Sequence, residues 1–191
     1  YDPASRHLHR MAGIAFHEAV PGHHFQLAIE QELTGLPQFR RFGSRMAAGA
    51  FIEGWGLYTE QLADEMGLYH TALERFGALE LDAWRAARLV VDTGIHALGW
   101  TRQQSIDLLI ERAGLSQLEA ETETDRYISW PGQALSYMIG QREILALRAQ
   151  LEARDGDRFD RRAFHDQVIG HGSLALSVLR EQLPDWVAPA D

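Results

Sequence analysis

The sequence predicts an all-α fold, and three observations support this prediction. Apolar residues recur with helical spacing through most of the 191 residues. Capping residues and glycines bound several of these stretches. No stretch alternates apolar and polar residues with the period of two that is typical of a half-buried strand. We therefore expect a multi-helix domain without a sheet.

The helices follow from this periodicity in chain order. Pro21-Gly22 separates the first two, and Gly77 and Gly94 interrupt the fourth. Thr101 and Gly114 are the expected N-cap and stop of the fifth. An acidic and polar segment precedes Trp130-Pro131-Gly132, where the sixth helix is expected to begin. The expected helices cover residues 5–20, 23–33, 44–66, 71–98, 102–113, 130–154, 160–169 and 173–183.

Composition restricts the class of function. The net charge of −9 argues against a nucleic-acid or anionic-membrane partner, because either would need a basic face. The chain has no cysteine, so a metal would be held by His, Asp or Glu. No apolar run reaches the roughly 18 residues of a membrane span. The cellular compartment, cytoplasmic or exported, and the oligomeric state are left open.

The most informative motif is His17-Glu18-Ala19-Val20-Pro21-Gly22-His23-His24. Adjacent histidine and glutamate with later histidines are the parts of a zinc hydrolase site. In the common form H-E-x-x-H the two histidines share one helix face, but here Pro21 occupies the position of the second histidine. His24 returns to the face of His17 only after about 10 Å of helix rise, and His23 lies about 120° away. A kink at Pro21 brings either histidine back, so local geometry leaves both open.

Glu53, in Phe51-Ile52-Glu53-Gly54-Trp55-Gly56, is the best candidate for a third ligand. It lies among apolar and small residues, where an unpaired carboxylate is unfavourable and metal coordination offsets the penalty. Glu60 follows seven residues later on the same face, which makes it a candidate hydrogen-bond partner for a ligating histidine. The alternatives without a metal ion are a solvent-exposed pair of His17 and Glu18 and a buried ion pair between Glu53 and an arginine.

These motifs, with Arg126-Tyr127-Ile128-x-Trp130-Pro131-Gly132-Gln133-Ala134-x-Ser136-Tyr137 and Phe164-His165-Asp166, resemble the bacterial family known as domain of unknown function 885. The resemblance covers nearly the whole chain. It implies a relationship in fold to the carboxypeptidase Taq-like and angiotensin-converting-enzyme-like zinc metallopeptidases, which are gluzincin-like helical clefts. By that resemblance one Zn²⁺ ion is held by His17, His23 and Glu53.

The resemblance also implies a function. Glu18 is the general base for metal-activated water, and Tyr127 and Tyr137 are candidate donors to the developing oxyanion. The expected activity is that of a zinc-dependent hydrolase, a peptidase or carboxypeptidase acting on a peptide or small amide. Because the chain begins at Tyr1 without methionine, with its main motif close to the start, we expect residues 1–191 to form a single catalytic region from the C-terminal half of a longer protein.

Three alternatives compete with this interpretation. A di-iron carboxylate bundle needs Glu-x-x-His pairs, and no glutamate here has a histidine three residues later. A degenerate peptidase that binds metal as a helical scaffold would not need Glu18, so the presence of Glu18 disfavours this alternative. A non-peptidase amidohydrolase with the same zinc chemistry stays open.

Overall fold

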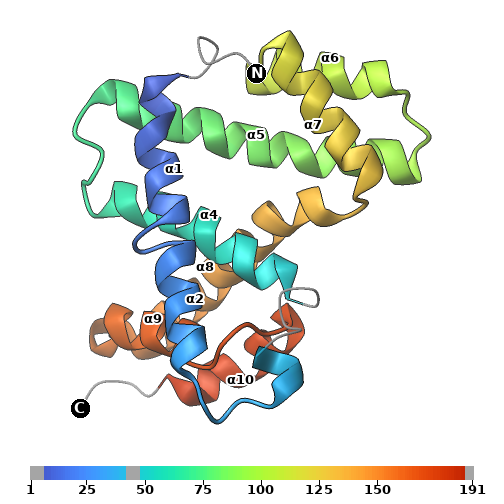
Figure 1. Cartoon of the computed structure of the whole chain (residues 1–191). Coiled ribbons are helices and arrows are strands. Elements are labelled where there is room, and N and C mark those ends of the chain that lie inside the picture. The colour runs from blue at the N-terminus through green and yellow to red at the C-terminus, as the bar shows by residue number, and fades with distance from the viewer. Residues whose placement is uncertain (1–6, 42–47, 188–191) are drawn as a thin grey trace.

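The computed structural model describes residues 7–41 and 48–187, and within these ranges the chain forms helices and no strand (Figure 1). The all-α prediction is confirmed. No helix in the described ranges combines the length and the apolarity needed to cross a membrane. The described helices are η2 (Leu8–Arg10), α1 (Met11–Glu18), α2 (His23–Glu32), α4 (Gly49–Glu65), α5 (Ala72–Ala97), α6 (Arg102–Ala113), α7 (Gln117–Ser129), η3 (Gln133–Leu135), α8 (Ser136–Asp155), η4 (Gly156–Arg158), α9 (Arg161–Ile169) and α10 (Leu176–Trp186).

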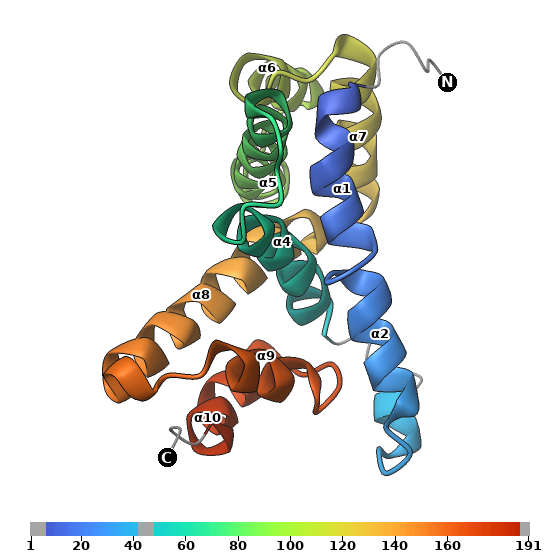
Figure 2. The ribbon, with the colours of Figure 1, turned by 90° about the vertical axis from the view of Figure 1, so that its left-hand side faces the viewer.

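The centre of the molecule is the crossing of α4 and α8, which contact each other more extensively than any other pair of described elements. Glycines allow this approach: a Cβ atom on Gly140 would lie 2.6 Å from Cα of Gly54 and would collide with the carbonyl oxygen of Ala50. The main apolar core extends from this crossing toward α9 and α10, which lie beneath α8 (Figure 2). Its largest fully buried side chains include Trp55, Tyr58 and Phe164.

A second core lies between α5, α6 and α7 on the other side of the crossing (Figure 1). Thr71, Thr101 and Ser116 each form a capping box at the N-terminus of one of these helices, so the sequence specifies where each begins. Helix α1 contacts both α4 and α5. It therefore joins the two halves of the molecule close to the point where they meet.

The expected interruptions of the fourth helix are wrong, because α5 runs unbroken from Ala72 to Ala97. Gly77 and Gly94 mark close packing instead. A Cβ atom on Gly77 would collide with the carbonyl oxygen of His9, and one on Gly94 would lie 2.5 Å from Cε3 of Trp100. Both glycines admit a neighbour to the helix surface, and the tertiary contacts offset their low helix propensity.

The acidic segment also differs from the prediction, since it forms α7. Its buried positions are Ala120, Thr124 and Tyr127. Two of these three are small or polar, so the helical periodicity is weak in the sequence. The next helix begins at Ser136, later than expected, because Trp130 to Gly132 form a turn before η3. Of the long helix predicted over residues 44–66, α4 accounts for Gly49–Glu65, and residues 44–47 lie outside the described ranges.

Candidate metal centre

The turn between α1 and α2 places two histidines side by side. Helix α1 ends at Glu18, and α2 begins at His23. A Cβ atom on Gly22 would collide with the carbonyl oxygen of His17, so the tight return of the chain requires glycine. The imidazoles of His17 and His23 meet edge to face with ring centroids 4.6 Å apart.

Two side chains of helix α4 hold this turn in place by hydrogen bonds. The indole Nε1 of Trp55 donates a hydrogen bond to the carbonyl oxygen of Pro21 at 2.9 Å. The hydroxyl of Thr59 lies 3.0 Å from the carbonyl oxygen of Phe16, one of the C-terminal carbonyls that α1 leaves without an intrahelical partner. These contacts hold α1 and α2 against α4, the helix that carries Glu53.

Glu53 completes the cluster. Its Oε2 atom lies 3.3 Å from Nε2 of His23 and 3.8 Å from Nε2 of His17. Each of the three residues offers one ligand atom, and these atoms all lie within 4.8 Å of one another. His24, the alternative that local geometry left open, is exposed and lies outside the cluster.

Gly56 makes room for both imidazoles. A Cβ atom at this position would lie 2.7 Å from Cε1 of His17 and 2.9 Å from Cε1 of His23. Glu53 and Gly56 lie one turn apart on α4, so the helix supplies a ligand at one position and space at the next. In the sequence, Gly56 is part of a motif, and this role could not be predicted from it.

Glu60 holds the second nitrogen of His17. Its Oε1 atom lies 2.8 Å from Nδ1 of His17, as expected for the hydrogen-bond partner of a ligating histidine. The same oxygen is 3.4 Å from Nη2 of Arg85, a buried residue that no sequence motif singled out. This carboxylate fixes the ring orientation, so the Nε2 atom of His17 faces Glu53.

The charges of the cluster reinforce one another. Burial opposes ionisation of Glu53, but the neighbouring imidazoles of His17 and His23 outweigh it and lower the pKa of Glu53 to about 2. Burial likewise opposes protonation of His17, but the neighbouring carboxylates of Glu53 and Glu60 outweigh it and raise the pKa of His17. The site therefore holds an ionised carboxylate and stabilises positive charge beside it.

Residues of η3 and α8 close the site on another side. Nε2 of Gln133 donates to Oε1 of Glu53 at 3.1 Å and to the hydroxyl of Tyr137 at 3.4 Å. The ring of Tyr137 stacks on that of His17, with centroids 6.0 Å apart. Tyr137 thus lies beside the cluster, with its hydroxyl close to the amide that contacts Glu53.

Tyr127 is placed differently. Its hydroxyl accepts hydrogen bonds from Nε1 of Trp84 at 3.1 Å and from Nε of Arg88 at 2.9 Å. It is fully buried in the core between α5, α6 and α7. The guanidinium of Arg88 also lies over the ring of Tyr137, so Arg88 stands between Tyr127 and the site.

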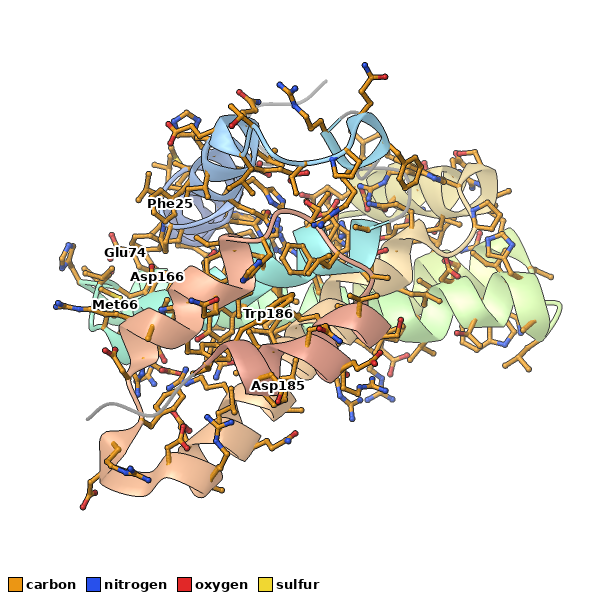
Figure 3. The ribbon with its side chains drawn as sticks, turned by 90° about the horizontal axis from the view of Figure 1, so that it is seen from below. Phe25, Met66, Glu74, Asp166, Asp185 and Trp186 are labelled. Atoms are coloured by element: carbon orange, nitrogen blue, oxygen red, sulfur yellow. The ribbon has the colours of Figure 1, made fainter. Side chains whose placement is uncertain are left out.

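Glu18 and the Phe164-His165-Asp166 motif are not part of the three-residue cluster. Glu18 is the last residue of α1 and is exposed, directly after His17. His165 lies away from the cluster, where its Nε2 atom is 2.7 Å from the hydroxyl of Tyr58. Asp166 is exposed on the outer face of α9 (Figure 3). Within this motif, Phe164 and His165 belong to the packing of the core and Asp166 does not, since Phe164 is buried in the main core and His165 also contacts Trp55.

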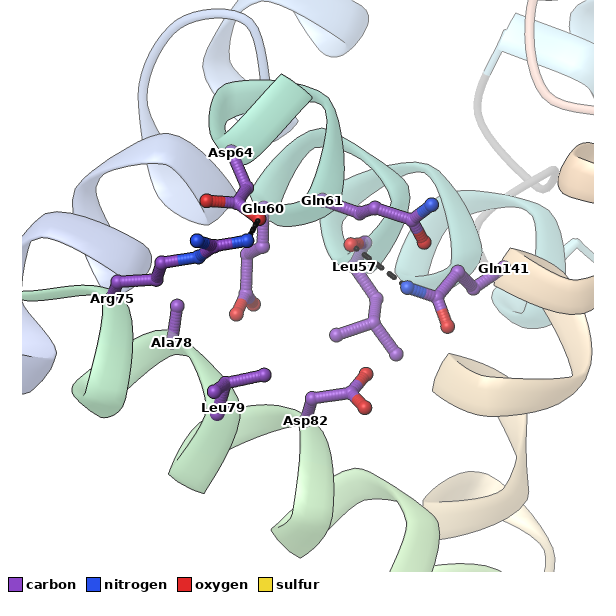
Figure 4. A pocket seen from close by; sticks show the side chains of 9 residues that line it. All are labelled: Leu57, Glu60, Gln61, Asp64, Arg75, Ala78, Leu79, Asp82 and Gln141. Carbon is purple, nitrogen blue, oxygen red and sulfur yellow. Dashed lines mark hydrogen bonds and ion pairs between the residues drawn. The ribbon is translucent and has the colours of Figure 1, made fainter. Parts of the chain in front are cut away.

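A cavity of about 200 Å³ lies next to the centre, between α4, α5 and α8 (Figure 4). Glu60 lines it, together with Asp64, Arg75, Asp82 and Gln141. Arg75 pairs with Asp64 at 2.9 Å. None of His17, His23 and Glu53 lines this cavity, so it is distinct from the cluster.

The cluster fits a divalent metal ion. Zinc–ligand bonds of about 2.1 Å in tetrahedral geometry place neighbouring ligand atoms about 3.4 Å apart, close to the 3.3 and 3.8 Å found between Glu53 and the two imidazoles. Nδ1 of His17 contacts Glu60, and Nδ1 of His23 lies 3.5 Å from Oε1 of Gln26. Partners on the second nitrogen are typical of metal-binding histidines.

The chain is thus an all-helical protein with a two-histidine, one-glutamate cluster at the junction of its two halves. Residues 1–183 match the family described as bacterial protein of unknown function (DUF885), and the chain belongs to this family. The resemblance found in the sequence motifs is confirmed. No curated protein sequence matches the chain.

Solved structures are similar to it, and two of them are candidate lipoproteins. One is a candidate lipoprotein from Colwellia psychrerythraea, with 40% sequence identity and a TM-score of 0.92 over 97% of this chain and 31% of that one. The other is a candidate lipoprotein of unknown function from Shewanella oneidensis, with 29% identity and a TM-score of 0.81 over 91% of this chain and 31% of that one. The chain therefore spans about a third of the length of these relatives.

Proposed function

We propose that this chain carries the metal site of a zinc-dependent hydrolase that cleaves peptide or related amide bonds. One observation supports this most strongly. Nε2 of His17, Nε2 of His23 and Oε2 of Glu53 converge, while the remaining polar atoms of the three side chains contact Glu60, Gln26 and Gln133. Three ligands whose orientation is fixed in this way suit a catalytic zinc ion, which keeps a fourth position open.

A bound zinc ion would act there as a Lewis acid and lower the pKa of a water molecule. Glu18, next to His17 and exposed, accepts a proton from the attacking water and delivers it to the nitrogen that leaves when the C–N bond breaks. Tyr137 donates a hydrogen bond from its hydroxyl to the oxyanion that develops on the carbonyl oxygen. Its stacking on His17 favours it over Tyr127, whose hydroxyl faces Trp84 and Arg88.

The substrate class and the relationship to the carboxypeptidase Taq-like and angiotensin-converting-enzyme-like peptidases rest on the motif resemblance. This chain spans about a third of the length of its solved relatives. The proposed activity is therefore assigned to the whole protein. The description of both relatives as candidate lipoproteins supports an exported location.

The test of the metal site is zinc content, measured by mass spectrometry on the purified protein and on His17→Ala and Glu53→Ala. We expect about one zinc per chain, lost in both variants. His24→Ala is the matched control, because His24 is an exposed neighbour of His23 outside the cluster. A protein without bound metal, or one that keeps its metal in both variants, contradicts the proposal.

Hydrolysis is tested separately with Glu18→Gln in a peptide-library assay. We expect this variant to keep its zinc and to lose at least about 100-fold in turnover, in line with the contribution of general-base catalysis. A zinc-loaded wild-type protein that cleaves no peptide or amide leaves only the metal-binding scaffold. Cleavage that is unchanged in Glu18→Gln excludes Glu18 as the base.

A further inference from the structure

We propose that Gln133 is a positioning residue that fixes how Glu53 presents its carboxylate to the metal and how Tyr137 directs its hydroxyl. This assignment rests on the proposed function, because it concerns the same site. Gln133 is half-buried in η3, and its amide lies between the metal cluster and α7.

The orientation of the Gln133 amide is determined by its neighbour Arg126. Nη2 of Arg126 lies 2.7 Å from Oε1 of Gln133. A guanidinium only donates hydrogen bonds, so the amide atom that faces it must be the oxygen. The NH₂ group is thereby directed to the opposite side, toward Glu53 and Tyr137.

Arg126 is itself held in place. Its Nη1 atom lies 3.3 Å from Oε1 of Glu123, and the other oxygen of Glu123 accepts from Nη2 of Arg88 at 3.1 Å. Arg126 therefore forms an ion pair with Glu123 of the same helix. A line of charged contacts thus leads from α5 through α7 to the Gln133 amide.

The backbone before Gln133 is fixed as well. The amide N–H of Gly132 donates to Oδ2 of Asp92, a buried carboxylate on α5, at 3.0 Å. Gly132 has φ of +81°, a conformation that favours glycine. The turn that carries Gln133 is therefore attached to α5, independently of the metal cluster.

The consequence for Glu53 is a division of its two oxygens. Oε1 accepts from Gln133, and Oε2 faces His17 and His23. An oxygen engaged by a neutral donor is less available to the metal, so the arrangement favours coordination through Oε2 alone. A one-oxygen ligand keeps the coordination number low and leaves a position for the reacting groups.

The consequence for Tyr137 follows from the same amide. An NH₂ group has two protons, so it can donate to Glu53 and to the oxygen of Tyr137 at once. A phenolic oxygen that accepts from Gln133 keeps its own proton for another acceptor. Gln133 therefore directs the hydroxyl of Tyr137 to donate, which is what an oxyanion on the substrate requires.

The test replaces Gln133 by methionine, which keeps the length of the side chain and removes both hydrogen-bonding atoms. We expect Gln133→Met to weaken zinc binding about 10–100-fold, the usual effect of losing a partner of a metal ligand. Affinity is measured by competition with a chromophoric chelator. The cobalt-substituted protein gives a second readout, because four-coordinate Co²⁺ absorbs visible light more strongly than five-coordinate Co²⁺, and a two-oxygen Glu53 would reduce the absorption.

Three further variants separate positioning from a structural effect. Arg126→Met should weaken zinc binding in the same direction, and Arg126→Lys, which restores a donor to the amide oxygen, should recover most of it. Gln141→Met is the matched control, because Gln141 is a buried glutamine on α8 that donates to the carbonyl oxygen of Leu57 outside the cluster. Circular dichroism of the metal-free proteins shows whether each variant is folded.

The outcomes are distinguishable. Unchanged zinc affinity and an unchanged cobalt spectrum in folded Gln133→Met overturn the positioning role and leave the proposed metal site intact. An equal loss in Gln141→Met also overturns it, because the effect would then be that of any lost buried amide. A wild-type protein that binds no metal overturns the proposed function, and this assignment with it.

Discussion

At the scale of single residues, the site depends as much on what surrounds the ligands as on the ligands themselves. Glu60 orients His17, and Gln133 orients Glu53. Both imidazoles occupy space that is free because residue 56 is a glycine without a side chain. The candidate ligands and Glu60 could be predicted from the sequence because carboxylate and imidazole groups have recognisable metal-site chemistry. Gly56 and Gln133 could not, because a glycine or a glutamine has no specific meaning until its neighbours in space are known.

The first prediction concerns Gly56. We expect Gly56→Ala to abolish or weaken zinc binding at least about 10-fold, because the added methyl group would displace both imidazoles. Gly49→Ala on the same helix is the control, since a Cβ atom there would lie 3.7 Å from Oγ of Ser136, an ordinary contact. Equilibrium dialysis against zinc measures both. Wild-type affinity in Gly56→Ala would show that the histidines are not confined as described.

The choice between His23 and His24 also belongs to this scale. Helix geometry left both open, because the path of residues 19–22 is set by contacts that the sequence does not display. Those contacts are the close approach of Gly22 to His17 and the hydrogen bond from Trp55 to Pro21. The motif resemblance selected His23, and the structure places His23 in the cluster.

At the scale of elements, most helices were predictable because local signals specify them. Thr101 and Gly114 bound α6 as expected, with Gly114 at φ of +65°. The errors occur where tertiary packing replaces local signals. Gly77 and Gly94 resemble breaks in sequence but admit His9 and Trp100 to the surface of α5.

The crossing of α4 and α8 supports the second prediction. Alanine is the better helix former by about 0.8–1.0 kcal/mol, yet we expect Gly140→Ala to lower the free energy of unfolding by about 1–3 kcal/mol, because the Cβ atom would force α8 away from Gly54 and Ala50. Zinc affinity should fall as well, since Glu53 lies on α4 and Tyr137 on α8. Urea unfolding and dialysis measure the two effects.

Gly49→Ala again provides the comparison, because it adds the same methyl group to α4 at an uncrowded position. We expect no loss of stability in this variant. If Gly140→Ala were as stable as the wild type, the two helices would have room to separate, and the close crossing would not be required for the fold.

At the scale of the whole molecule, the cluster of His17, His23 and Glu53 lies where two separately packed halves meet. Helix α1, which carries His17, contacts both α4 and α5, and the turn before Gln133 is attached to α5 through Asp92. The sequence predicted the helices of each half, but not this junction, since it depends on long-range contacts such as Gly132 with Asp92 and Gln133 with Glu53. Site geometry and the packing of the halves are therefore coupled.

The pH dependence of unfolding tests how His165 contributes to the stability of the half that contains α9 and α10. Burial, together with the charges of Arg148 and Arg161, lowers the pKa of His165 to about 4. In the unfolded chain the pKa is about 6.5, so the unfolded state binds more protons between these values. The contribution of neutral His165 to stability is therefore complete above pH 6.5 and is lost as the pH falls to about 4.

We expect His165→Gln to remove this component of the pH dependence. The full shift corresponds to about 3 kcal/mol, and solvent screening of a partly exposed group reduces the expected change to about 1–2 kcal/mol. The measurement is the free energy of urea unfolding at pH 7 and pH 4.5, compared between wild type and variant, so that carboxylates common to both cancel. His70→Gln, at an exposed histidine, should leave the wild-type dependence unchanged. An identical pH dependence in wild type and His165→Gln would mean that His165 accepts its proton as readily in the folded protein as in the unfolded chain, against its contact with Tyr58 and the two arginines.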